Sequence, residues 1–335
     1  MLFFTFLRCL SQTIKQTCLL GMRYLNSLRL VILLSVLAGT MTQASPPEFP
    51  LNPQVEVRGD VSFLDPSRAE KLDLYLPKNR KTGEKSPAVL LIHGGGWKEG
   101  DKRQPREIEF GTTLAENGYV AASVNYALRS AGKFPINLQD CKNGIRYLRA
   151  HAGELGIDPN RIAVMGGSAG GHLALLVAYT GDNADVAPTE PYPGVSDKVS
   201  CVVDFYGITD IGTRKKTDPN GKPTESRGVE SEVQAIFGSN PEDWEKASPV
   251  GYIRKDLPPT LILHGRRDTT VDSDQSQELA DALKKTGATY EIIWLPSAPH
   301  SFSFQYAVPK SKKPLDRNVG PEVLAFLRKH LVKTQ

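Results

Sequence analysis

Short hydrophobic runs alternate with amphipathic segments along most of the chain. The runs are rich in Val, Ile and Leu and end at turn-forming residues, as buried strands do. They lie at residues 54–63, 72–77, 88–92, 119–126, 161–165, 200–205, 259–264 and 290–295. Helical periodicity is found at 105–117, 136–151, 169–180, 273–286 and 319–331. Because strands that alternate with helices form sheets covered on both faces, the pattern predicts an α/β domain. We expect a mostly parallel eight-stranded sheet with its ligand site at the carboxyl ends of the strands.

The longest interval without a strand separates 200–205 from 259–264. Residues 212–230 are polar and rich in Lys, Asp, Pro and Gly, whereas 233–237 and 244–252 have helical character. Long insertions of this kind often border binding sites. We therefore expect a small polar cap or rim at 212–252, and its hydrophilic character favours water-soluble substrates.

The amino terminus has the pattern of a secretory signal. Arg23 and Arg29 precede the hydrophobic run 30–38, and the small residues Thr42 and Ala44 suit cleavage by signal peptidase. The run is shorter than the ~20 residues that span a bilayer comfortably, so a retained anchor is the weaker interpretation. We expect a leader at 1–44 with a signal peptide at 22–44, which leaves open whether Met1 or Met22 is the start. The mature domain, 45–335, is then secreted or periplasmic without a stable membrane anchor.

Composition agrees with a single domain of this kind. The chain has 335 residues, of which 40% are hydrophobic, and a net charge of only +4. That length is enough for one α/β domain with a full core. No repeat and no stripe of arginine and aromatic residues is present, which argues against a nucleic-acid partner. Lys215, Lys216 and residues 310–313 lie in polar segments and are interpreted as solvated loops; the oligomeric state is left open.

Two cysteines, Cys141 and Cys201, remain after removal of the leader. A disulfide between them is possible in an oxidising compartment. One lies in a predicted helix and the other begins a predicted strand, and such positions commonly bury free cysteine. The sequence leaves both states open.

A serine lies between a predicted strand and a predicted helix, in the sequence Gly166-Gly167-Ser168-Ala169-Gly170. The pattern G-x-S-x-G is typical of a tight turn that exposes a nucleophile at the top of a sheet. The flanking glycines leave no Cβ to collide with the strand or the helix. Taken alone, the pentapeptide could equally be an ordinary glycine-rich turn.

A second glycine-rich segment, His93-Gly94-Gly95-Gly96-Trp97, ends the run 88–92. Acyl transfer develops a negative oxygen that backbone amides stabilise, and loss of one donor costs about 3 kcal/mol. We assign this oxyanion hole to the amides of Gly95, Gly96 and Ala169. A phosphate-binding loop is the alternative, but the spacing G-x-G-x-x-G is absent and no acidic residue ends the next strand.

A nucleophilic serine needs a base and a carboxylate that orients the base. Asp268 follows the run 259–264, and His300 follows the run 290–295. The order Ser168, Asp268, His300 is the order of the α/β-hydrolase triad. Asp204, Asp210 and Asp272 are competitors for the acid, and either Asp268 or Asp272 could reach His300 from one loop.

The other histidines fit different roles. His93 braces the glycine loop, and His172 lies on the helix after Ser168 as a packing residue. His264 lies too near the acid's own loop to be the base. Two further histidines, His151 and His330, end amphipathic helices, where a positive charge suits the helix dipole.

Together these residues resemble the α/β-hydrolase-fold esterases, specifically the carbohydrate-esterase-like (BD-FAE-like) group of feruloyl and acetylxylan esterases, related to the hormone-sensitive-lipase type. The resemblance extends over residues 54–330. It rests on the segments His93–Trp97, Gly166–His172, Asp204–Gly207, His264–Asp268 and Pro299–Phe302. Gly167 replaces the Asp usual in the lipase-type sequences, Asp272 replaces a proline, and Pro299 and Ser301 replace glycines that often flank the histidine.

The resemblance implies a serine esterase that acts through an acyl-enzyme on short-chain or hydroxycinnamoyl esters, small or linked to plant polysaccharide. Such chemistry requires no metal and no organic cofactor. Trp97 could stack on a sugar or an aromatic acyl group, or it could only pack the loop. A peptidase of the prolyl-oligopeptidase type, a formamidase and a non-catalytic binding protein of the same fold are the alternatives.

Overall fold

The computed structural model describes residues 52–80, 83–214 and 231–331. The expected leader at 1–44, with its signal peptide, lies outside these ranges. Within them, no helix has both the length and the hydrophobicity that a bilayer crossing requires.

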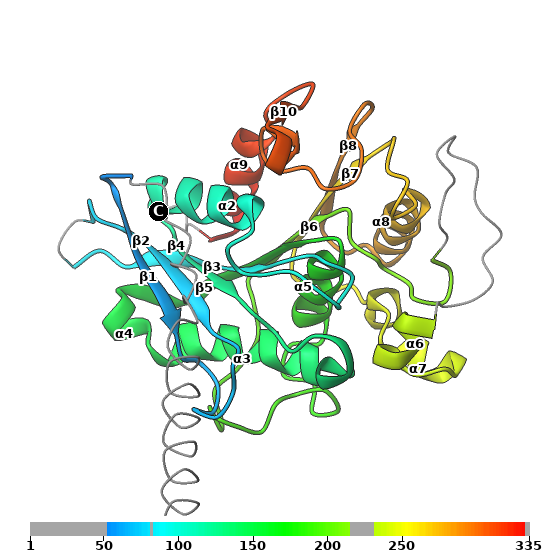
Figure 1. Ribbon diagram of the computed structural model, residues 1–335, viewed down its shortest axis with the longest axis horizontal. Coiled ribbons are helices and arrows are strands. Elements are labelled where there is room, and N and C mark those ends of the chain that lie inside the picture. Colours follow the sequence, from blue (N-terminus) through cyan, green and yellow to red (C-terminus); the bar gives the residue numbers. More distant parts are fainter. Residues whose placement is uncertain (1–51, 81–82, 215–230, 332–335) are drawn as a thin grey trace, which may run out of the picture. The chain divides into compact units, whose positions relative to one another are not determined.

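An eight-stranded sheet forms the centre of the domain (Figure 1). Its strands follow the order β1-β2-β4-β3-β5-β6-β7-β8, and β2 runs antiparallel to both of its neighbours while all other pairs are parallel. This confirms the α/β fold class with its mostly parallel eight-stranded sheet. The strands are β1 Val55–Val61, β2 Leu72–Pro77, β3 Ser86–Ile92, β4 Val120–Val124, β5 Ile157–Gly167, β6 Cys201–Phe205, β7 Thr260–Gly265 and β8 Tyr290–Leu295.

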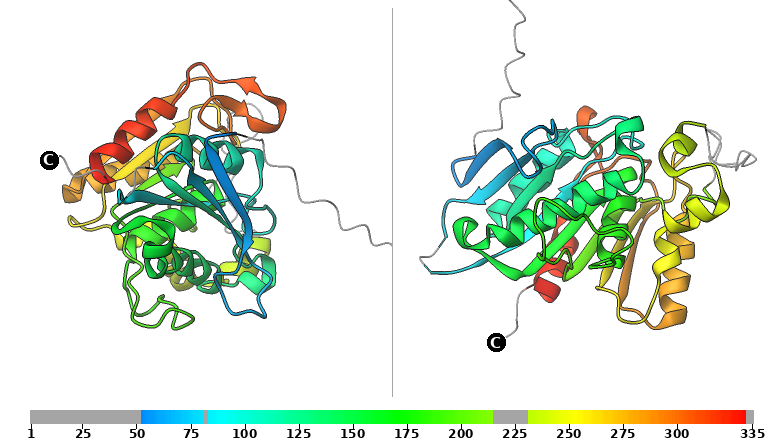
Figure 2. Two further views of the ribbon diagram at one scale, coloured as in Figure 1. Left: turned by 90° about the vertical axis from the view of Figure 1, so that its left-hand side faces the viewer. Right: turned by 90° about the horizontal axis from the view of Figure 1, so that it is seen from below.

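Helices cover both faces of the sheet, and Figure 2 shows the sheet between α9 and the layer of α3 and α5. The principal helices are α2 Pro105–Glu116, α3 Ile136–Ala150, α5 Ala169–Tyr179, α8 Asp274–Thr286 and α9 Gly320–Leu331. Shorter elements are η1 Arg129–Gly132, α4 Ala152–Leu155, α6 Ser231–Phe237, α7 Pro241–Lys246, η2 Pro249–Tyr252, β9 Tyr306–Val308, η3 Pro309–Ser311 and β10 Lys313–Pro314. The excursion from β9 to β10 was not among the predicted elements.

Each central strand contributes side chains to two separate cores. In β3, Leu90 and Ile92 pack with the helices α3, α5 and α8, whereas Val89 and Leu91 pack with α2 and α9. Successive side chains of a strand point to opposite faces, so a strand buried on both faces is hydrophobic throughout. The continuous hydrophobic runs in the sequence have this cause.

The two cysteines of the described domain are free and buried. Cys141 belongs to the core on one face of the sheet, and Cys201 belongs to the core on the other. A disulfide requires Cα atoms within about 7 Å and converging Cβ vectors, which an intervening sheet prevents. Of the two states that the sequence leaves open, the structure has the free thiols.

Part of the cap or rim that the sequence predicts at 212–252 packs into the core. In α6, Val233, Ile236 and Phe237 are buried and belong to the core that includes α3 and α5. Among the described residues of 212–252, only Arg214 lines the pocket described below. The part from α6 to η2 therefore belongs to the core, because its hydrophobic side chains are buried against neighbouring elements. Residues 215–230 lie outside the described ranges.

Candidate active site

Ser168 occupies a strained turn between β5 and α5. Its backbone has φ 58° and ψ −125°, and its N–H donates to the carbonyl oxygen of Phe205 at 2.9 Å. The turn approaches β3 so closely that a Cβ on Gly170 would lie 2.1 Å from the carbonyl oxygen of Ile92. A Cβ on Gly166 would lie 2.3 Å from the carbonyl oxygen of Gly170. The pentapeptide is thus the predicted sharp elbow, and its glycines are required by contact with neighbouring backbone.

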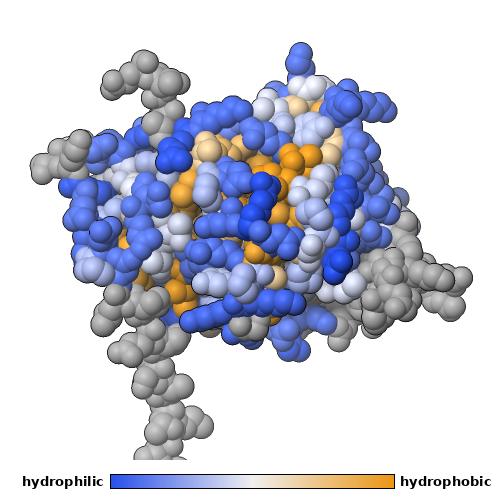
Figure 3. All heavy atoms as spheres, turned by 90° about the horizontal axis from the view of Figure 1, so that it is seen from above, coloured by the Kyte–Doolittle hydropathy of each residue, from blue (hydrophilic) through white to orange (hydrophobic). Residues whose placement is uncertain are grey.

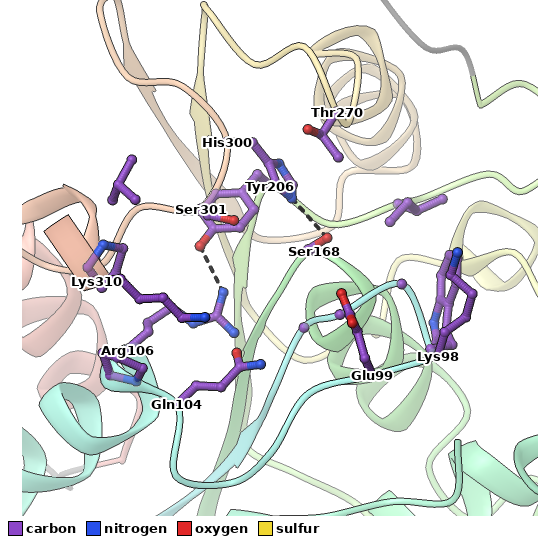
Figure 4. A pocket seen from close by; sticks show the side chains of 18 of the residues that line it. Lys98, Glu99, Gln104, Arg106, Ser168, Tyr206, Thr270, His300, Ser301 and Lys310 are labelled. Atoms are coloured by element: carbon purple, nitrogen blue, oxygen red, sulfur yellow. Dashed lines mark hydrogen bonds between the residues drawn. The ribbon is translucent and has the colours of Figure 1, made fainter. Parts of the chain in front are cut away.

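The structure brings the three residues of the predicted triad together, and Figure 4 shows the contact between Ser168 and His300. Nε2 of His300 lies 3.0 Å from Oγ of Ser168, and Nδ1 of His300 lies 2.6 Å from Oδ2 of Asp268. Both distances are within hydrogen-bond range, and each ring nitrogen has a different partner. A proton can therefore pass from Ser168 to His300 while Asp268 holds the opposite side of the ring.

Asp268 is held as a carboxylate by several donors. Its Oδ1 accepts from the backbone N–H groups of Thr270 and Val271, at 2.8 and 2.9 Å. Burial alone favours the neutral acid, but hydrogen bonds from His264 and His300 hold the pKa of Asp268 well below its usual range. The side chain is therefore ionised at neutral pH and can stabilise a charged imidazole.

His264 contacts the acid directly, a role that the sequence interpretation missed. The ring is fully buried, with Nε2 3.3 Å from Oδ2 of Asp268 and 3.1 Å from the carbonyl oxygen of Val271. Its Nδ1 lies 2.6 Å from Oγ of Ser276 on α8. Since Nε2 faces two acceptors, the proton belongs on Nε2 and Ser276 donates to Nδ1. The position of His264 four residues before Asp268, at the end of a strand, was the available signal.

The competing carboxylates have other partners. Asp272 accepts from the backbone N–H of Asp274 at the start of α8, at 3.0 Å, and Asp210 accepts from the N–H of Gly212 at 2.7 Å. Asp204 is fully buried and accepts from the N–H of Gly207 at 3.0 Å. Within the described chain none of the three is hydrogen-bonded to His300, so Asp268 is the acid that the geometry selects.

The glycine loop presents unused amides beside Ser168. Gly95 and Gly96 line the same pocket as Ser168 and have φ values of 120° and 62°. The N–H groups of Lys98 and Glu99 donate to the carbonyl oxygen of Gly95, which closes the turn. Within the described chain, no backbone carbonyl accepts a hydrogen bond from the amides of Gly95 or Gly96.

Ala169 completes the predicted set of three amides. It is the first residue of α5, so its N–H has no intrahelical acceptor and lies at the positive end of the helix dipole. The assignment of Gly95, Gly96 and Ala169 as an oxyanion hole is compatible with this arrangement and remains a proposal.

Trp97 packs the glycine loop. The sequence leaves open whether it has this role or stacks on a substrate. The side chain borders the pocket but is only 1% exposed, and its Nε1 donates to Nδ1 of His172 at 3.2 Å. One ring edge meets Phe237 of α6, and the guanidinium of Arg214 lies 5.8 Å from the ring centroid. Stacking on a substrate is disfavoured, because the ring has almost no accessible surface.

His172 connects the glycine loop to the insertion. Burial lowers its pKa to about 4, so the ring is neutral at neutral pH. Its Nδ1 accepts from Trp97, and its Nε2 donates to the carbonyl oxygen of Ala247 at 2.7 Å. Two segments far apart in sequence are thereby joined behind the proposed oxyanion hole, as expected for a packing residue.

Arg106 and Tyr206 support the loop that carries His300. Nη1 of Arg106 donates to the hydroxyl of Tyr206 at 2.8 Å, and this hydroxyl donates to the carbonyl oxygen of Phe302 at 2.6 Å. The rings of Tyr206 and His300 meet edge to face with centroids 4.8 Å apart. Burial raises the pKa of Tyr206 to about 12, so the hydroxyl keeps its proton as a donor. Neither residue is among the site residues that the sequence predicts.

A pocket of about 490 Å³ opens beside Ser168 and His300. Val308, Pro309 and Lys310 line it, from the excursion between β9 and β10. Lys310 is exposed, as the interpretation as a solvated loop predicts, and it also lines this pocket. Pairing between β9 and β10 folds this segment back towards the triad, which no local pattern indicates.

The BD-FAE family model matches residues 72–283, a span that includes Ser168 and Asp268. The chain belongs to the BD-FAE family. This assignment confirms the resemblance inferred from the motifs, including the glycine loop that begins at His93.

Two relatives of this BD-FAE family member come from Mycobacterium tuberculosis (strain ATCC 25618 / H37Rv). The esterase LipQ is 28% identical over 250 residues, which cover 74% of this chain and 58% of LipQ. The probable carboxylic ester hydrolase LipM is 31% identical over 247 residues, which cover 73% of this chain and 56% of LipM. The chain thus matches less than two thirds of the length of either relative.

A solved relative is esterase 2 from the Planctomycetes species Thermogutta terrifontis, Est2. Its native structure superposes with a TM-score of 0.65 and 28% identity, and the match covers 86% of this chain and 96% of that one. Structures of Est2 are also described as propionate-bound, as butyrate-bound and as phosphorylated by paraoxon. The likeness supports the α/β-hydrolase fold for the whole described domain.

Proposed function

We propose that this protein is a serine hydrolase that cleaves carboxylic esters through an acyl-enzyme. The observation that carries the proposal is the hydrogen-bonded series from Oγ of Ser168 through His300 to Asp268, at 3.0 and 2.6 Å. The series opens into a pocket bordered by backbone amides. Membership of the BD-FAE family and likeness to named esterases support the same chemistry.

The first half of the reaction forms the acyl-enzyme. Oγ of Ser168 attacks the ester carbonyl while Nε2 of His300 takes the hydroxyl proton. Asp268 stabilises the imidazolium, and the new oxyanion accepts from the amides of Gly95, Gly96 and Ala169. His300 then donates its proton to the leaving alcohol as the bond between carbon and that oxygen breaks.

The second half releases the acid. Water replaces the alcohol, His300 takes one of its protons, and the resulting hydroxide attacks the acyl carbonyl. The tetrahedral intermediate collapses with departure of Oγ of Ser168, which recovers its proton from His300. Each half uses the same oxyanion donors. At the end of the reaction Ser168 and His300 have the protonation states in which they began.

We propose small, water-soluble esters of short or hydroxycinnamoyl acids as substrates, either free or carried on plant polysaccharide. The modest pocket supports this class, as do the propionate and butyrate in structures of Est2. On the face seen in Figure 3, hydrophilic residues surround a smaller central group of hydrophobic ones. Large hydrophobic side chains exposed among the described residues are Ile136 and Val308, so no broad hydrophobic surface suits a lipid substrate.

The proposal predicts that Ser168→Ala abolishes esterase activity. We expect kcat on p-nitrophenyl acetate to fall by roughly 10⁴-fold to 10⁶-fold, because nucleophile and base act as one unit. The exposed residue Ser239 provides a matched control, and Ser239→Ala keeps the parental rate. Unchanged hydrolysis in Ser168→Ala would refute the assignment of the nucleophile.

Substrate panels test the finer proposal. Acetylated xylan, methyl ferulate and p-nitrophenyl esters of increasing length are compared with a prolyl peptide. Rates that rise with acyl length beyond butyrate contradict the short-ester assignment, and faster cleavage of the peptide identifies a peptidase instead.

We propose further that residues 22–44 direct the protein out of the cytoplasm and are then removed. The support is the sequence pattern of two arginines, a hydrophobic run and Ala44. Amino-terminal sequencing of protein from the extracellular or periplasmic fraction should begin at residue 45. A full-length chain recovered in the membrane fraction would instead identify a retained anchor.

A further inference from the structure

Arg106 reaches the pocket with hydrogen-bond donors to spare. Its guanidinium has five N–H groups. Nε and Nη2 donate to Oε1 of Glu107, and Nη1 donates to Tyr206. These bonds use three N–H groups, and the other two have no acceptor in the described part of the chain. The side chain is 8% exposed and lines the pocket that contains Ser168.

Lys310 adds a net positive charge on the same side. Glu107 offsets much of the charge of Arg106, but it does not line the pocket. Lys310 is exposed, lines the pocket and forms no ion pair with any described residue. Figure 4 shows Arg106 and Lys310 directed to one part of the pocket, with the amide of Gln104 next to them.

Basic side chains outnumber acidic ones on the described pocket wall. Lys98, Arg106, Arg214 and Lys310 line it, against the single acidic liner Glu99 among the described residues. In Figure 4, Glu99 lies beside Lys98, across the pocket from Lys310. The side with Arg106, Gln104 and Lys310 therefore presents N–H donors and positive charge without a carboxylate in the pocket wall.

We propose that this side of the pocket binds a carboxylate of the substrate, so that the enzyme prefers esters that carry a free carboxylate near the scissile bond. The inference rests on the proposed esterase function and names a substrate class for it. The spare N–H groups of Arg106 meet the carboxylate oxygens, and Lys310 supplies the charge that attracts them. Because Lys310 is exposed, its contribution is screened and falls with added salt.

Neutral hydroxyl groups of a substrate could also accept from these donors. Pairs of isosteric substrates, one with a carboxylate and one with a neutral amide, distinguish recognition of charge from recognition of neutral groups. On the alcohol side, 3-acetoxybenzoate is compared with 3-acetoxybenzamide. On the acyl side, methyl hydrogen succinate is compared with methyl succinamate. The kcat/KM ratio of acid to amide is divided by the ratio of their alkaline hydrolysis rates, which removes the intrinsic difference in reactivity.

We expect the corrected ratio to exceed about tenfold in at least one pair at low salt, and to fall as NaCl is raised, as charge recognition at a partly exposed site requires. Lys310→Gln should lower the ratio by about three- to fivefold, as loss of one partly screened charge near the carboxylate predicts. Lys313→Gln removes the same charge from an exposed position of the same loop outside the pocket wall. This control should keep the parental ratio.

Corrected ratios near one in both pairs overturn the proposal, and so does an equal loss of preference in Lys310→Gln and Lys313→Gln. Either result leaves esterase activity in place. Failure of the proposed function looks different, since neither the acid nor the amide is then hydrolysed in a manner that depends on Ser168.

Discussion

Two buried carboxylates near the site differ in charge because their surroundings differ. Asp268 receives two backbone N–H groups and two histidines, which hold its pKa well below the usual range despite burial. Asp204 has one backbone donor, on Oδ1, and its Oδ2 is buried with no hydrogen-bond partner among the described residues. Burial therefore raises the pKa of Asp204 to about 7. The same side-chain type is thus fully ionised at neutral pH in one position and keeps its proton up to about pH 7 in the other.

The state of Asp204 predicts a pH-dependent effect of Asp204→Asn. The folded parent keeps the Asp204 proton up to about pH 7, whereas the unfolded chain loses it near pH 4. The free energy of unfolding of the parent therefore falls as pH rises between these values. We expect Asp204→Asn to be more stable than the parent by about 1–3 kcal/mol at pH 8, and by much less at pH 4.5.

Urea unfolding over a pH series measures this difference. Asp316 is exposed, and Asp316→Asn serves as the control, with no comparable pH-dependent gain. A constant difference between Asp204→Asn and the parent from pH 4.5 to 8 would contradict the assigned protonation state.

The contact between His264 and Asp268 predicts that His264 orients the acid. Replacement in His264→Phe removes the donor near Oδ2 of Asp268 and leaves the hydroxyl of Ser276 without its ring partner. We expect kcat to fall by about 10-fold to 100-fold with little change in KM, less than the ~10⁴-fold loss when a triad acid is replaced. Steady-state kinetics on p-nitrophenyl acetate give both constants. Ser276→Ala should have the smaller effect, and parental kcat in a folded His264→Phe protein would exclude the role.

At the scale of elements, the start of α5 is joined to the end of β3. Gly170 brings the helix against the carbonyl oxygens of Ile92 and His93, and Ser168 and the glycine loop are placed on either side of this contact. The positions of nucleophile and proposed oxyanion hole therefore depend on one close backbone approach.

This approach predicts the effect of Gly170→Ala. The new Cβ would lie 2.1 Å from the oxygen of Ile92 and 2.6 Å from that of His93, so α5 must move away. We expect a loss of about 1–3 kcal/mol in the free energy of unfolding, together with lower kcat. A Cβ added to Gly153 in α4 would lie within 4 Å of no described atom outside its own helix turn and chain neighbours, and Gly153→Ala should be neutral or stabilising by up to about 1 kcal/mol. Denaturant unfolding compares the variants, and equal stabilities would disprove the close contact.

At the scale of the whole described domain, the sheet separates two cores that share no side chains. Cys141 and Cys201 lie in different cores, and burial raises the pKa of both thiols. Neither thiol is accessible or nucleophilic in the folded state.

The native protein should therefore protect both thiols from iodoacetamide. Mass spectrometry of peptides that contain Cys141 and Cys201 should find no label before denaturation and complete labelling after it, without reductant. Protection that persists in denaturant and is removed by dithiothreitol would instead reveal a disulfide.

The strands, the principal helices and the order of Ser168, Asp268 and His300 could be predicted from local patterns of residues. These features are local: a strand buried on both faces is hydrophobic throughout, an amphipathic helix repeats every turn, and the glycines around Ser168 follow from one tight turn. The α/β fold class follows from the alternation of these local patterns.

The contacts between side chains from distant segments could not be predicted from local patterns. Cys141 and Cys201 are assigned to opposite faces, Trp97 is buried by Phe237, and Lys310 is turned into the pocket. Each of these depends on contacts between segments far apart in the chain. The hydrophobic periodicity of a segment does not indicate which distant segment it contacts. Local patterns state which face of an element is buried, whereas the partner on that face is chosen by the packing of the whole domain.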